Sequence, residues 1–520
     1  MRSHSQTELR TSRWPVSTIS VVIVLALALA ACSPSVAPNA SASVSAVGGT
    51  LTIAQTADPL GVWPGLTPTQ STITVVEQIT EKLIEYNPNG AGYVPRLATA
   101  WNQVNPTTVR FELRKNVKFS NGEPFNADSV KFSLGVMKDQ KQWASGYAKY
   151  IKDATVVDPY TVDIASTAPT SLLMPSIARM AFQFPPAYFQ QSTLEGFAQK
   201  PIGTGPYVFD SWTKGVSVVM TRNDTYWNGK PAFDKVVWKI IPEASSQIAA
   251  LQSGAVDVVP LLPSNFWGSI QGANVKLVTA PSDAIYVAVF NTLQPGPLQN
   301  PLVRQAMQLA VDADALIKST LEGQALPMTD QPLTSSYVGY VPNRPTFKYD
   351  PQKAKSLLAQ AGFPNGFTTK LTTSSKESKE VVQVLADQLA KVGIVLQYEI
   401  LDFGTFVQKL IAPPSGIPGL YYANSITGPH AHYQYVPYQT GGVFSYYANP
   451  KYQALLDQAA VEPDEAKARD LYRQMLDVLA ADPAYIPLFQ GKDGYAISSR
   501  LDGFAPWHTQ FLDVSAWHFK

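Results

Sequence analysis

The residues able to do covalent chemistry are few. The chain of 520 residues has one cysteine, Cys32, and five histidines. A single thiol forms no intrachain disulfide and no multi-cysteine metal site. The motifs G-x-S-x-G, H-E-x-x-H and G-x-x-x-x-G-K-[ST] are absent, so no hydrolase nucleophile elbow, zinc-protease pair or phosphate loop is predicted. We expect no enzyme and no resident cofactor, with a hydrolase as the remote alternative.

Aromatic and imidazole side chains gather between residues 421 and 447 and are the candidates for ligand contact. The members chosen are Tyr421, Tyr422, Asn424, His430 and His432. Aromatic rings suit sugar faces, aromatic side chains or cationic groups. The alternative is a loop packed by its own tyrosines. His430 and His432 would share a face of a strand and could ligate nickel or copper, but no third ligand is evident, so no metal site is predicted.

Two further segments are candidates for the rim of a ligand site. Trp63 follows the first predicted strand, in the stretch 58–64, and either reaches a cleft or packs internally. The turn-rich segment 331–340 is a second candidate. These candidates are far apart in the sequence. Only the fold can place the histidine pair, Trp63 and this segment around one ligand.

The first fifty residues predict export. Residues 1–31 carry three arginines and then eleven unbroken apolar residues, Val21 to Ala31. A bilayer-spanning helix needs about 20 such residues, so this is a signal peptide. The stretch Leu29-Ala30-Ala31-Cys32 resembles a bacterial lipobox, whose cysteine is diacylated and anchors the protein; an ordinary signal peptide is the alternative. Residues 32–48, rich in Ser, Ala and Pro, form a flexible tether.

Charge and composition limit the partners. Lys plus Arg is 40 and Asp plus Glu is 39, a net charge of +1 that becomes −1 without residues 1–31. Near-neutrality argues against nucleic acid as a partner. Hydrophobic residues are 45% and aromatic residues 11% of the chain, which excludes general disorder.

Hydrophobic periodicity alternates between strand and helix, so we predict a mixed α/β class. The pattern predicts strands at 50–55, 117–119, 285–290 and 393–400, and helices that include 73–86 and 129–137. Asn126 and Asp350 are expected to cap helices, the latter with proline at the first helical position.

Four ordered segments together resemble one family, family 5 of the bacterial extracellular solute-binding proteins. They are 94–125 (VPRLATAW, FELRKNVKF and NGEPF), 201–227 (PIGTGPY and RNDTYW), 300–312 (NPLVRQA and AVD) and 349–367 (YDPQKAK and AGFPNGF). The family includes the oligopeptide-, dipeptide- and nickel-binding components of ABC importers.

The resemblance implies a periplasmic-binding-protein-like fold (type II, cluster C) with two main lobes joined by a hinge and an inserted third lobe. Lobe I would comprise 49–76, 201–282 and 486–520, lobe II 77–200 and lobe III 283–485. Crossovers would lie near Ser282 and Tyr485, with the ligand between lobes I and III.

The implied function is capture of di- or oligopeptides by a monomeric, lipid-anchored protein on the outer face of the cytoplasmic membrane, and their delivery to ABC permease subunits. Oligosaccharides or nickel chelates are alternative ligands, and a sensing lipoprotein is an alternative role. Peptide-binding relatives usually carry a W-x-x-D-Y-like stretch whose Asp pairs with the peptide ammonium. No carboxylate occurs here between Asp402 and Asp457, so this route to a free N-terminus is in question.

Overall fold

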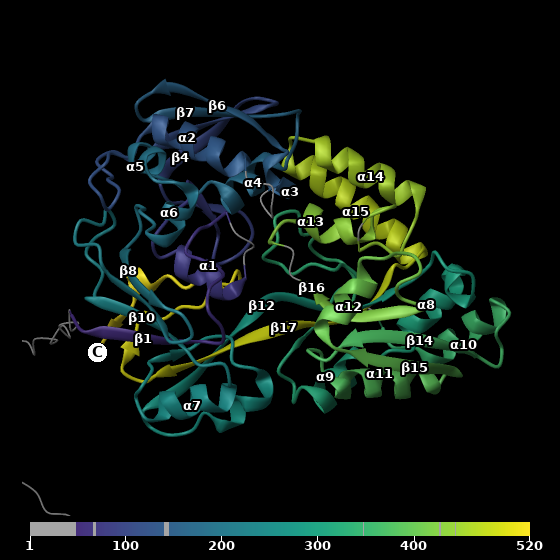
Figure 1. Cartoon of the computed structure of the whole chain (residues 1–520). Coiled ribbons are helices and arrows are strands. Elements are labelled where there is room, and N and C mark those ends of the chain that lie inside the picture. The colour runs from purple at the N-terminus through teal and green to yellow at the C-terminus, as the bar shows by residue number, and fades with distance from the viewer. Residues whose placement is uncertain (1–47, 66–68, 140–144, 347, 426–427, 443) are drawn as a thin grey trace, which may run out of the picture. The chain divides into compact units, whose positions relative to one another are not determined.

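The computed structural model describes residues 48–520 apart from 66–68, 140–144, 347, 426–427 and 443. The predicted signal peptide, Cys32 and the tether up to residue 47 lie outside the described residues. Strands and helices are interspersed along the chain, which confirms the α/β class (Figure 1). Within the described part, no helix combines the length and apolar character needed to span a bilayer.

One large mixed sheet is the framework of the two main lobes. Its strand order is β15-β14-β16-β12-β17-β11-β1-β10-β9-β8, and β13 pairs with β17 beside this path. The strands are β1 (Thr50–Gln55), β8 (Tyr207–Thr213), β9 (Ser217–Arg222), β10 (Lys235–Ile240), β11 (Val258–Val259), β12 (Val275–Phe290), β13 (Leu326–Pro327), β14 (Phe367–Ser374), β15 (Ile394–Leu401), β16 (Leu420–Ser425) and β17 (Tyr485–Ser498).

The long strands β12 and β17 connect the lobes (Figure 1). They pair antiparallel from Val275↔Ser498 to Val289↔Tyr485, and the ladder is irregular between Pro281 and Ile285. On one side of this irregularity β17 pairs with β11 of lobe I, and on the other side β12 pairs with β16 of lobe III. Residues around Ser282 therefore interrupt the pairing where the chain passes between lobes. On β17 the interruption is at Gly491, between the paired residues Gln490 and Lys492.

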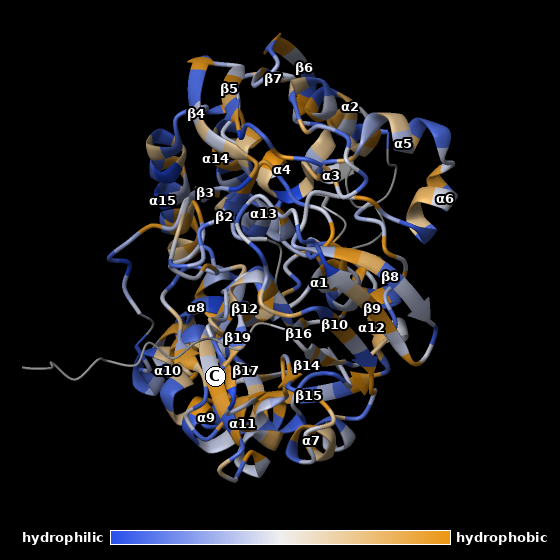
Figure 2. Cartoon of the chain, turned by 90° about the vertical axis from the view of Figure 1, so that its left-hand side faces the viewer, coloured by the Kyte–Doolittle hydropathy of each residue, from blue (hydrophilic) through white to orange (hydrophobic). Residues whose placement is uncertain are grey.

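Alternation along β12 explains why the C-terminal half of this strand is buried on both faces. Ile285, Val287 and Val289 belong to one hydrophobic core, whereas Ala288 and Phe290 belong to another. Successive side chains of a strand point to opposite faces, so one apolar run feeds two cores. Figure 2 shows hydrophobic residues along β17 and hydrophilic residues along the outer helix α15 (Glu465–Ala481).

Lobe II has a separate antiparallel sheet of order β4-β5-β7-β6 and its own aromatic-rich core. The strands of this sheet are β4 (Ala98–Asn105), β5 (Thr108–Leu113), β6 (Ile151–Asp158) and β7 (Thr161–Ser166), and lobe II also has a two-stranded sheet of β2 (Ile84–Tyr86) and β3 (Tyr93–Pro95). Near the C-terminus, β18 (Leu501–Asp502) pairs with β19 (His518–Phe519). The exact boundaries of the three lobes remain a prediction.

Helices cover both sheets. They are α1 (Gln70–Val76), α2 (Ala127–Lys138), α3 (Ser145–Ala148), α4 (Leu173–Met180), α5 (Pro186–Gln191), α6 (Leu194–Gln199), α7 (Ala244–Gln252), α8 (Pro301–Leu309), α9 (Ala313–Thr320), α10 (Pro351–Gln360), α11 (Lys379–Ala390), α12 (Phe403–Leu410), α13 (Ala431–Tyr435), α14 (Pro450–Val461) and α15, with short 3₁₀ segments at Ser264–Ser269, Pro297–Gln299, Val436–Tyr438 and Val514–Ala516. Both predicted caps are confirmed: Asn126 accepts from Ser129 N, and Asp350 accepts from Lys353 N with Pro351 at the helix start.

Two predicted elements are wrong. The helix expected over 73–86 is only α1, because the chain after Val76 bonds to another segment: Gly205 N donates to Ile79 O and Tyr207 N to Gln78 O. A Cβ on Gly205 would lie 2.4 Å from Gln78 O, so glycine permits this close approach. The strand expected at 117–119 is a single bridge, Lys118↔Pro124.

Candidate functional site

A cleft of about 750 Å³ lies between lobes I and III, and we call it the interlobe cleft. Lobe I contributes the loop 261–265. Lobe III contributes residues 376–378 and Glu380, together with Tyr422 and Asn424. The hinge strands supply Tyr286, Phe489 and residues 492–494. A ligand held here would contact both lobes at once.

Three rings from neighbouring strands form the aromatic wall of the interlobe cleft. Tyr286 on β12 stacks on Phe489 of β17 with centroids 4.4 Å apart, and Tyr422 of β16 lies 6.3 Å from Tyr286. The strand register explains this grouping, since Tyr286 is opposite Phe489 on one side and Asn424 on the other. The wall therefore offers apolar surface with polar tips.

Charged groups of both signs line the same cleft, and they include Lys376, Glu377, Lys492 and Asp493. Burial raises the pKa of Glu377, whose carboxylate accepts a hydrogen bond from the backbone of Asn424. Burial also raises the pKa of Asp493 to about 6, although hydrogen bonds, including that from Gln510, oppose the shift. A cationic ligand group would favour the ionised form of both carboxylates.

Gln510 is the residue at which the interlobe cleft meets two neighbouring cavities. Its Nε2 lies 3.1 Å from each carboxylate oxygen of Asp493. Its φ of 63° is in the left-handed region, which is costly for a residue with a side chain. The Gln510 side chain is thus placed at the branch point of the cavities.

A second cavity of about 330 Å³, which we call the junction cavity, is lined by residues of all three lobes. Asp283 accepts from Thr334 Oγ1 at 3.0 Å, and its other oxygen lies 2.7 Å from His508 Nδ1. His508 Nε2 lies 2.8 Å from Asn87 O. Both acceptors lack a proton, so the doubly protonated imidazolium fits this position. Burial lowers the His508 pKa, but the hydrogen bond and charge of Asp283 outweigh it and the pKa is raised.

The structure separates the predicted tyrosines. Tyr422 and Asn424 line the interlobe cleft. Tyr421 is their neighbour on β16 and faces the opposite core, where its hydroxyl donates to Phe444 O at 3.5 Å. Adjacent strand residues point to opposite faces, so Tyr421 and Tyr422 cannot line one cleft.

The two predicted histidines are buried. Their spacing had suggested a strand, and this was wrong, because they lie at the start of the helix α13. His430 is the N-cap of α13, and its Nδ1 accepts from His432 N at 3.2 Å. Burial lowers the pKa of His430 to about 3 and that of His432 to about 4, so both are neutral. Among the described residues, no group of three His, Cys, Asp or Glu could hold a metal ion.

Trp63 is placed in the core of lobe II and not at the interlobe cleft. Its ring is 2% exposed and packs 4.8 Å from Phe184, 5.6 Å from Phe189 and 5.4 Å from Phe197. The large apolar surface of tryptophan is satisfied there by other aromatic rings.

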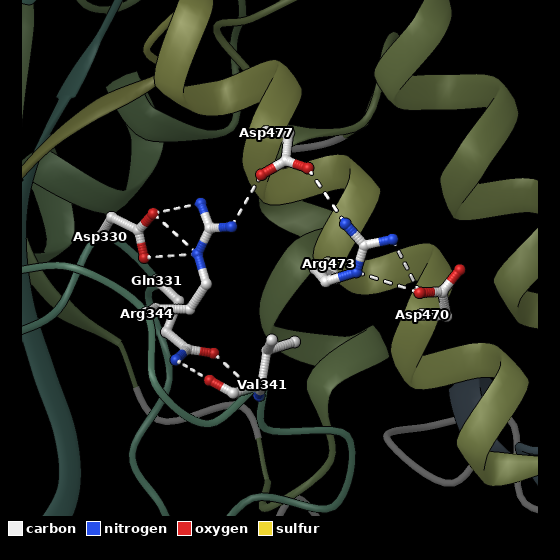
Figure 3. Close-up of polar contacts among 7 residues, drawn as sticks. All are labelled: Asp330, Gln331, Val341, Arg344, Asp470, Arg473 and Asp477. Atoms are coloured by element: carbon white, nitrogen blue, oxygen red, sulfur yellow. Dashed lines mark hydrogen bonds and ion pairs between the residues drawn. The ribbon is translucent and has the colours of Figure 1, made fainter.

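The segment 331–340 is anchored to lobe III. Gln331 and Val341 exchange two hydrogen bonds, of 2.7 and 3.2 Å (Figure 3). Arg344 then bonds both Asp330 and Asp477 of α15, and Arg473 continues this network to Asp470 (Figure 3). Among the described residues that line the interlobe cleft and the junction cavity, none comes from this segment.

Sequence reasoning missed most of the cleft. Tyr286 and Phe489 lie within apolar strands, and only the strand register brings them beside Asn424. Glu377 follows β14 and reaches Asn424 through space. No local signal in the sequence distinguishes Gln510 from other glutamines.

A hinged pair of lobes around a cleft lined from both sides defines a class, the two-lobed solute-binding proteins. The family model of the bacterial extracellular solute-binding proteins, family 5, matches residues 92–442. The chain belongs to this family, whose members are extracytoplasmic substrate-binding proteins of ABC importers.

Individual relatives agree with this assignment. The glutathione-binding protein GsiB of Escherichia coli K12 is 29% identical over 417 residues, which cover 76% of this chain and 80% of GsiB. The ABC transporter substrate-binding protein CtaP of Listeria monocytogenes superposes with a TM-score of 0.83 at 24% identity, covering 91% of this chain and 99% of CtaP. Helicobacter pylori DppA, in complex with the peptide STSA, gives 0.72 at 25% identity, covering 91% and 98%. The predicted fold with two hinged lobes is confirmed.

Proposed function

We propose that this chain is a monomeric, lipid-anchored binding protein that captures short peptides in the interlobe cleft and delivers them to its ABC permease. The supporting observation is a cleft that has an aromatic wall and both lysines and carboxylates among its lining residues. A short peptide is zwitterionic and has both charged ends and apolar side chains, so it complements both features. The residues proposed to contact it are Tyr286, Tyr422, Asn424, Glu377 and Asp493.

Glu377 supplies a carboxylate near the place where the segment 421–429 has none. Its side chain accepts from the backbone of Asn424, so it lies beside β16 although it comes from the loop after β14. Burial raises its pKa, so the ionised form gains from a nearby cation. We assign the peptide ammonium to Glu377 or Asp493 and the peptide carboxylate to Lys376 or Lys492.

The names of relatives favour peptide-like ligands. GsiB is named for glutathione, and the DppA structure holds the peptide STSA. The relatives are named as binding proteins, and we propose that this chain likewise makes and breaks no bonds in its ligand.

Ligand binding would favour the closed arrangement of the lobes because the ligand gains contacts on both sides only when they approach. Residues 282–284 of β12 and Gly491 of β17 interrupt the β12–β17 ladder at the crossing, so we assign the hinge to them. Anchoring through Cys32 would keep this protein at the outer face of the cytoplasmic membrane, next to the permease.

Calorimetric titration of the protein lacking residues 1–31 tests the ligand class. Di- to pentapeptide mixtures should bind. At least one of Glu377→Gln and Asp493→Asn, and at least one of Lys376→Met and Lys492→Met, should weaken binding at least fivefold. Tyr421→Phe, on the opposite face of β16, is the matched control and should bind as the parent does. Binding of cello-oligosaccharides or of nickel–histidine, with no response to any peptide, would contradict the proposal.

A further inference from the structure

Asp283 lies in the hinge and is held by both main lobes. Its side chain is 4% exposed, and one carboxylate oxygen accepts hydrogen bonds from Thr334 Oγ1 and Ser336 Oγ of lobe III. The other oxygen lies 2.7 Å from Nδ1 of His508, which belongs to the C-terminal segment of lobe I. Segments of two lobes therefore bind opposite oxygens of one hinge carboxylate. We call Asp283, Thr334, Ser336 and His508 the hinge clamp.

His508 also connects the hinge clamp to lobe II. Its Nε2 lies 2.8 Å from the backbone oxygen of Asn87, directly after β2. Carboxylate and carbonyl oxygens only accept hydrogen bonds, so both ring nitrogens must donate and the ring must carry two protons. A neutral imidazole has one donor, so loss of a proton removes one of the two contacts and leaves a nitrogen lone pair facing an oxygen.

The hinge clamp is formed in an arrangement in which lobe II touches lobe III. Thr170 Oγ1 of lobe II donates to Ala460 O in α14, and the ring of Tyr147 lies 4.7 Å from that of Tyr433 in α13. Opening of the cleft would rotate lobe III about the hinge and would move Thr334 relative to His508. Because both bind the same carboxylate, the intact clamp favours the closed arrangement over an open one.

Other charged groups face the junction cavity that contains His508. Lobe II contributes Glu77, Lys82, Glu85 and Arg179 to its lining. Lys82 lies 2.9 Å from Glu77 and 3.0 Å from Glu85, so these charges pair within lobe II. Burial raises the pKa of Glu85 to about 7, so this carboxyl group titrates near neutral pH and must be separated from His508 by experiment.

On the hinge side, two carboxylates act on the clamp. Burial lowers the pKa of His508, but the hydrogen bond and charge of Asp283 outweigh it and the pKa is raised, with smaller contributions from the backbone of Asn87 and Gly90. The charge of Asp493 on β17 interacts with that of Asp283. A raised pKa means that the clamp is complete below pH 6.5 and is lost as pH rises through the folded value.

We propose that the hinge clamp is a pH-sensitive switch of lobe closure: doubly protonated His508 holds the lobes together, and loss of its proton to solvent releases them. The open arrangement then gains population and the interlobe cleft holds its ligand less tightly. The effect on ligand rests on the proposed function of that cleft, whereas the effect on the lobes can be measured without ligand.

Fluorescence energy transfer between the lobes of single ligand-free molecules tests the switch. Dyes are attached through Ala273→Cys in lobe I and Ala359→Cys in lobe III, both at exposed positions, in a Cys32→Ala protein that lacks residues 1–31. The ratio of open to closed molecules should rise about tenfold from pH 6 to pH 9, the value of one hydrogen bond to a charged group. A ratio that stays constant over this range would overturn the switch.

Variants assign the change to His508. His508→Gln should show at both pH values the open population that the parent shows at pH 9. His518→Gln, a matched control on β19, and Glu85→Gln should both keep the parent's change with pH. A change that survives in His508→Gln, or that disappears in Glu85→Gln, would assign the titration to another group and overturn the proposal.

Thr334→Val tests the clamp from lobe III without altering a titratable group. It removes the hydroxyl donor to Asp283, so it should increase the open population at pH 6; an unchanged population would contradict the clamp. Circular dichroism confirms folding of each variant, and Thr334→Val with the parent's pH series decides the question if His508→Gln does not fold.

Peptide calorimetry separates the switch from the proposed function. Apparent affinity should fall between pH 7 and pH 9 by the factor by which the closed population falls. The peptide's own amino group titrates near pH 8, so the fall counts only where it exceeds that of His508→Gln. If the lobes respond to pH but no peptide binds, the proposed function fails and the switch stands. If peptides bind and the lobes do not respond, the switch fails alone.

Discussion

Ligand affinity should fall in acid through the titration of Asp493. Burial raises the pKa of this carboxylate to about 6, and it lines the interlobe cleft. With that pKa, about nine-tenths of the groups are ionised at pH 7 and about one-tenth at pH 5. If the bound peptide places its ammonium against ionised Asp493 and the protonated form binds about tenfold more weakly, apparent affinity should fall about fivefold over this range.

Titration calorimetry at pH 5, 6, 7 and 8 with a single peptide measures this slope, with circular dichroism to confirm folding at each pH. Asp493→Asn should bind about tenfold more weakly at pH 7 and should lose the slope. Glu377 also titrates in this cleft with a raised pKa, so Glu377→Gln is measured in parallel to assign any residual slope. The reasoning is refuted if the parent shows constant affinity from pH 5 to pH 7, or if Asp493→Asn keeps the parent's slope.

The remaining predictions concern anchoring, packing and the three-lobe junction. Cys32→Ala should release the protein from membranes, and a variant still bound after a high-salt wash would contradict the anchor. Gly205→Ala should destabilise folding by about 1–3 kcal/mol in urea titration, because its Cβ would meet Gln78 O; Gly135→Ala, whose Cβ has open space, should not. The raised pKa of His508 means that its stabilisation is complete below its ordinary pKa of 6.5 and is lost as pH rises through the folded value. His508→Gln should therefore lower Tm more at pH 6 than at pH 9, and an equal loss at both would count against the ion pair with Asp283.

Local rules predicted the elements whose signals are local. The caps at Asn126 and Asp350 depend on a side chain and a backbone N–H three residues apart, and both are present. The helix expected over 73–86 failed because its second half finds better partners elsewhere. Its apolar residues have helical spacing, but the backbone of Gln78 and Ile79 pairs with the segment beginning at Gly205.

Candidate ligand residues show the same limit. The composition of the segment 421–447 identified its aromatic residues as candidates. Which tyrosine faces the cleft depends on the alternation of side chains along β16, and the sequence does not give the position of that strand in the sheet. Tyr422 and Asn424 line the cleft, whereas Tyr421 packs in the opposite core. Trp63 was expected near the cleft, but it buries its apolar ring against other aromatic rings in a hydrophobic core.

The position of Glu377 bears on how motif loss should be interpreted in this family. The stretch 421–429 lacks the carboxylate that peptide-binding relatives usually carry, and sequence alone therefore weakened the case for recognition of a free N-terminus. Glu377 reaches the backbone of Asn424 from a different loop, and Asp493 approaches the same cleft from β17. An ammonium group requires a carboxylate within a few ångströms and is indifferent to the strand that supplies it. If Glu377→Gln and Asp493→Asn each weaken peptide binding, the carboxylate that pairs with the peptide ammonium comes from other segments in this protein. If neither variant weakens binding, loss of the motif means loss of N-terminal recognition.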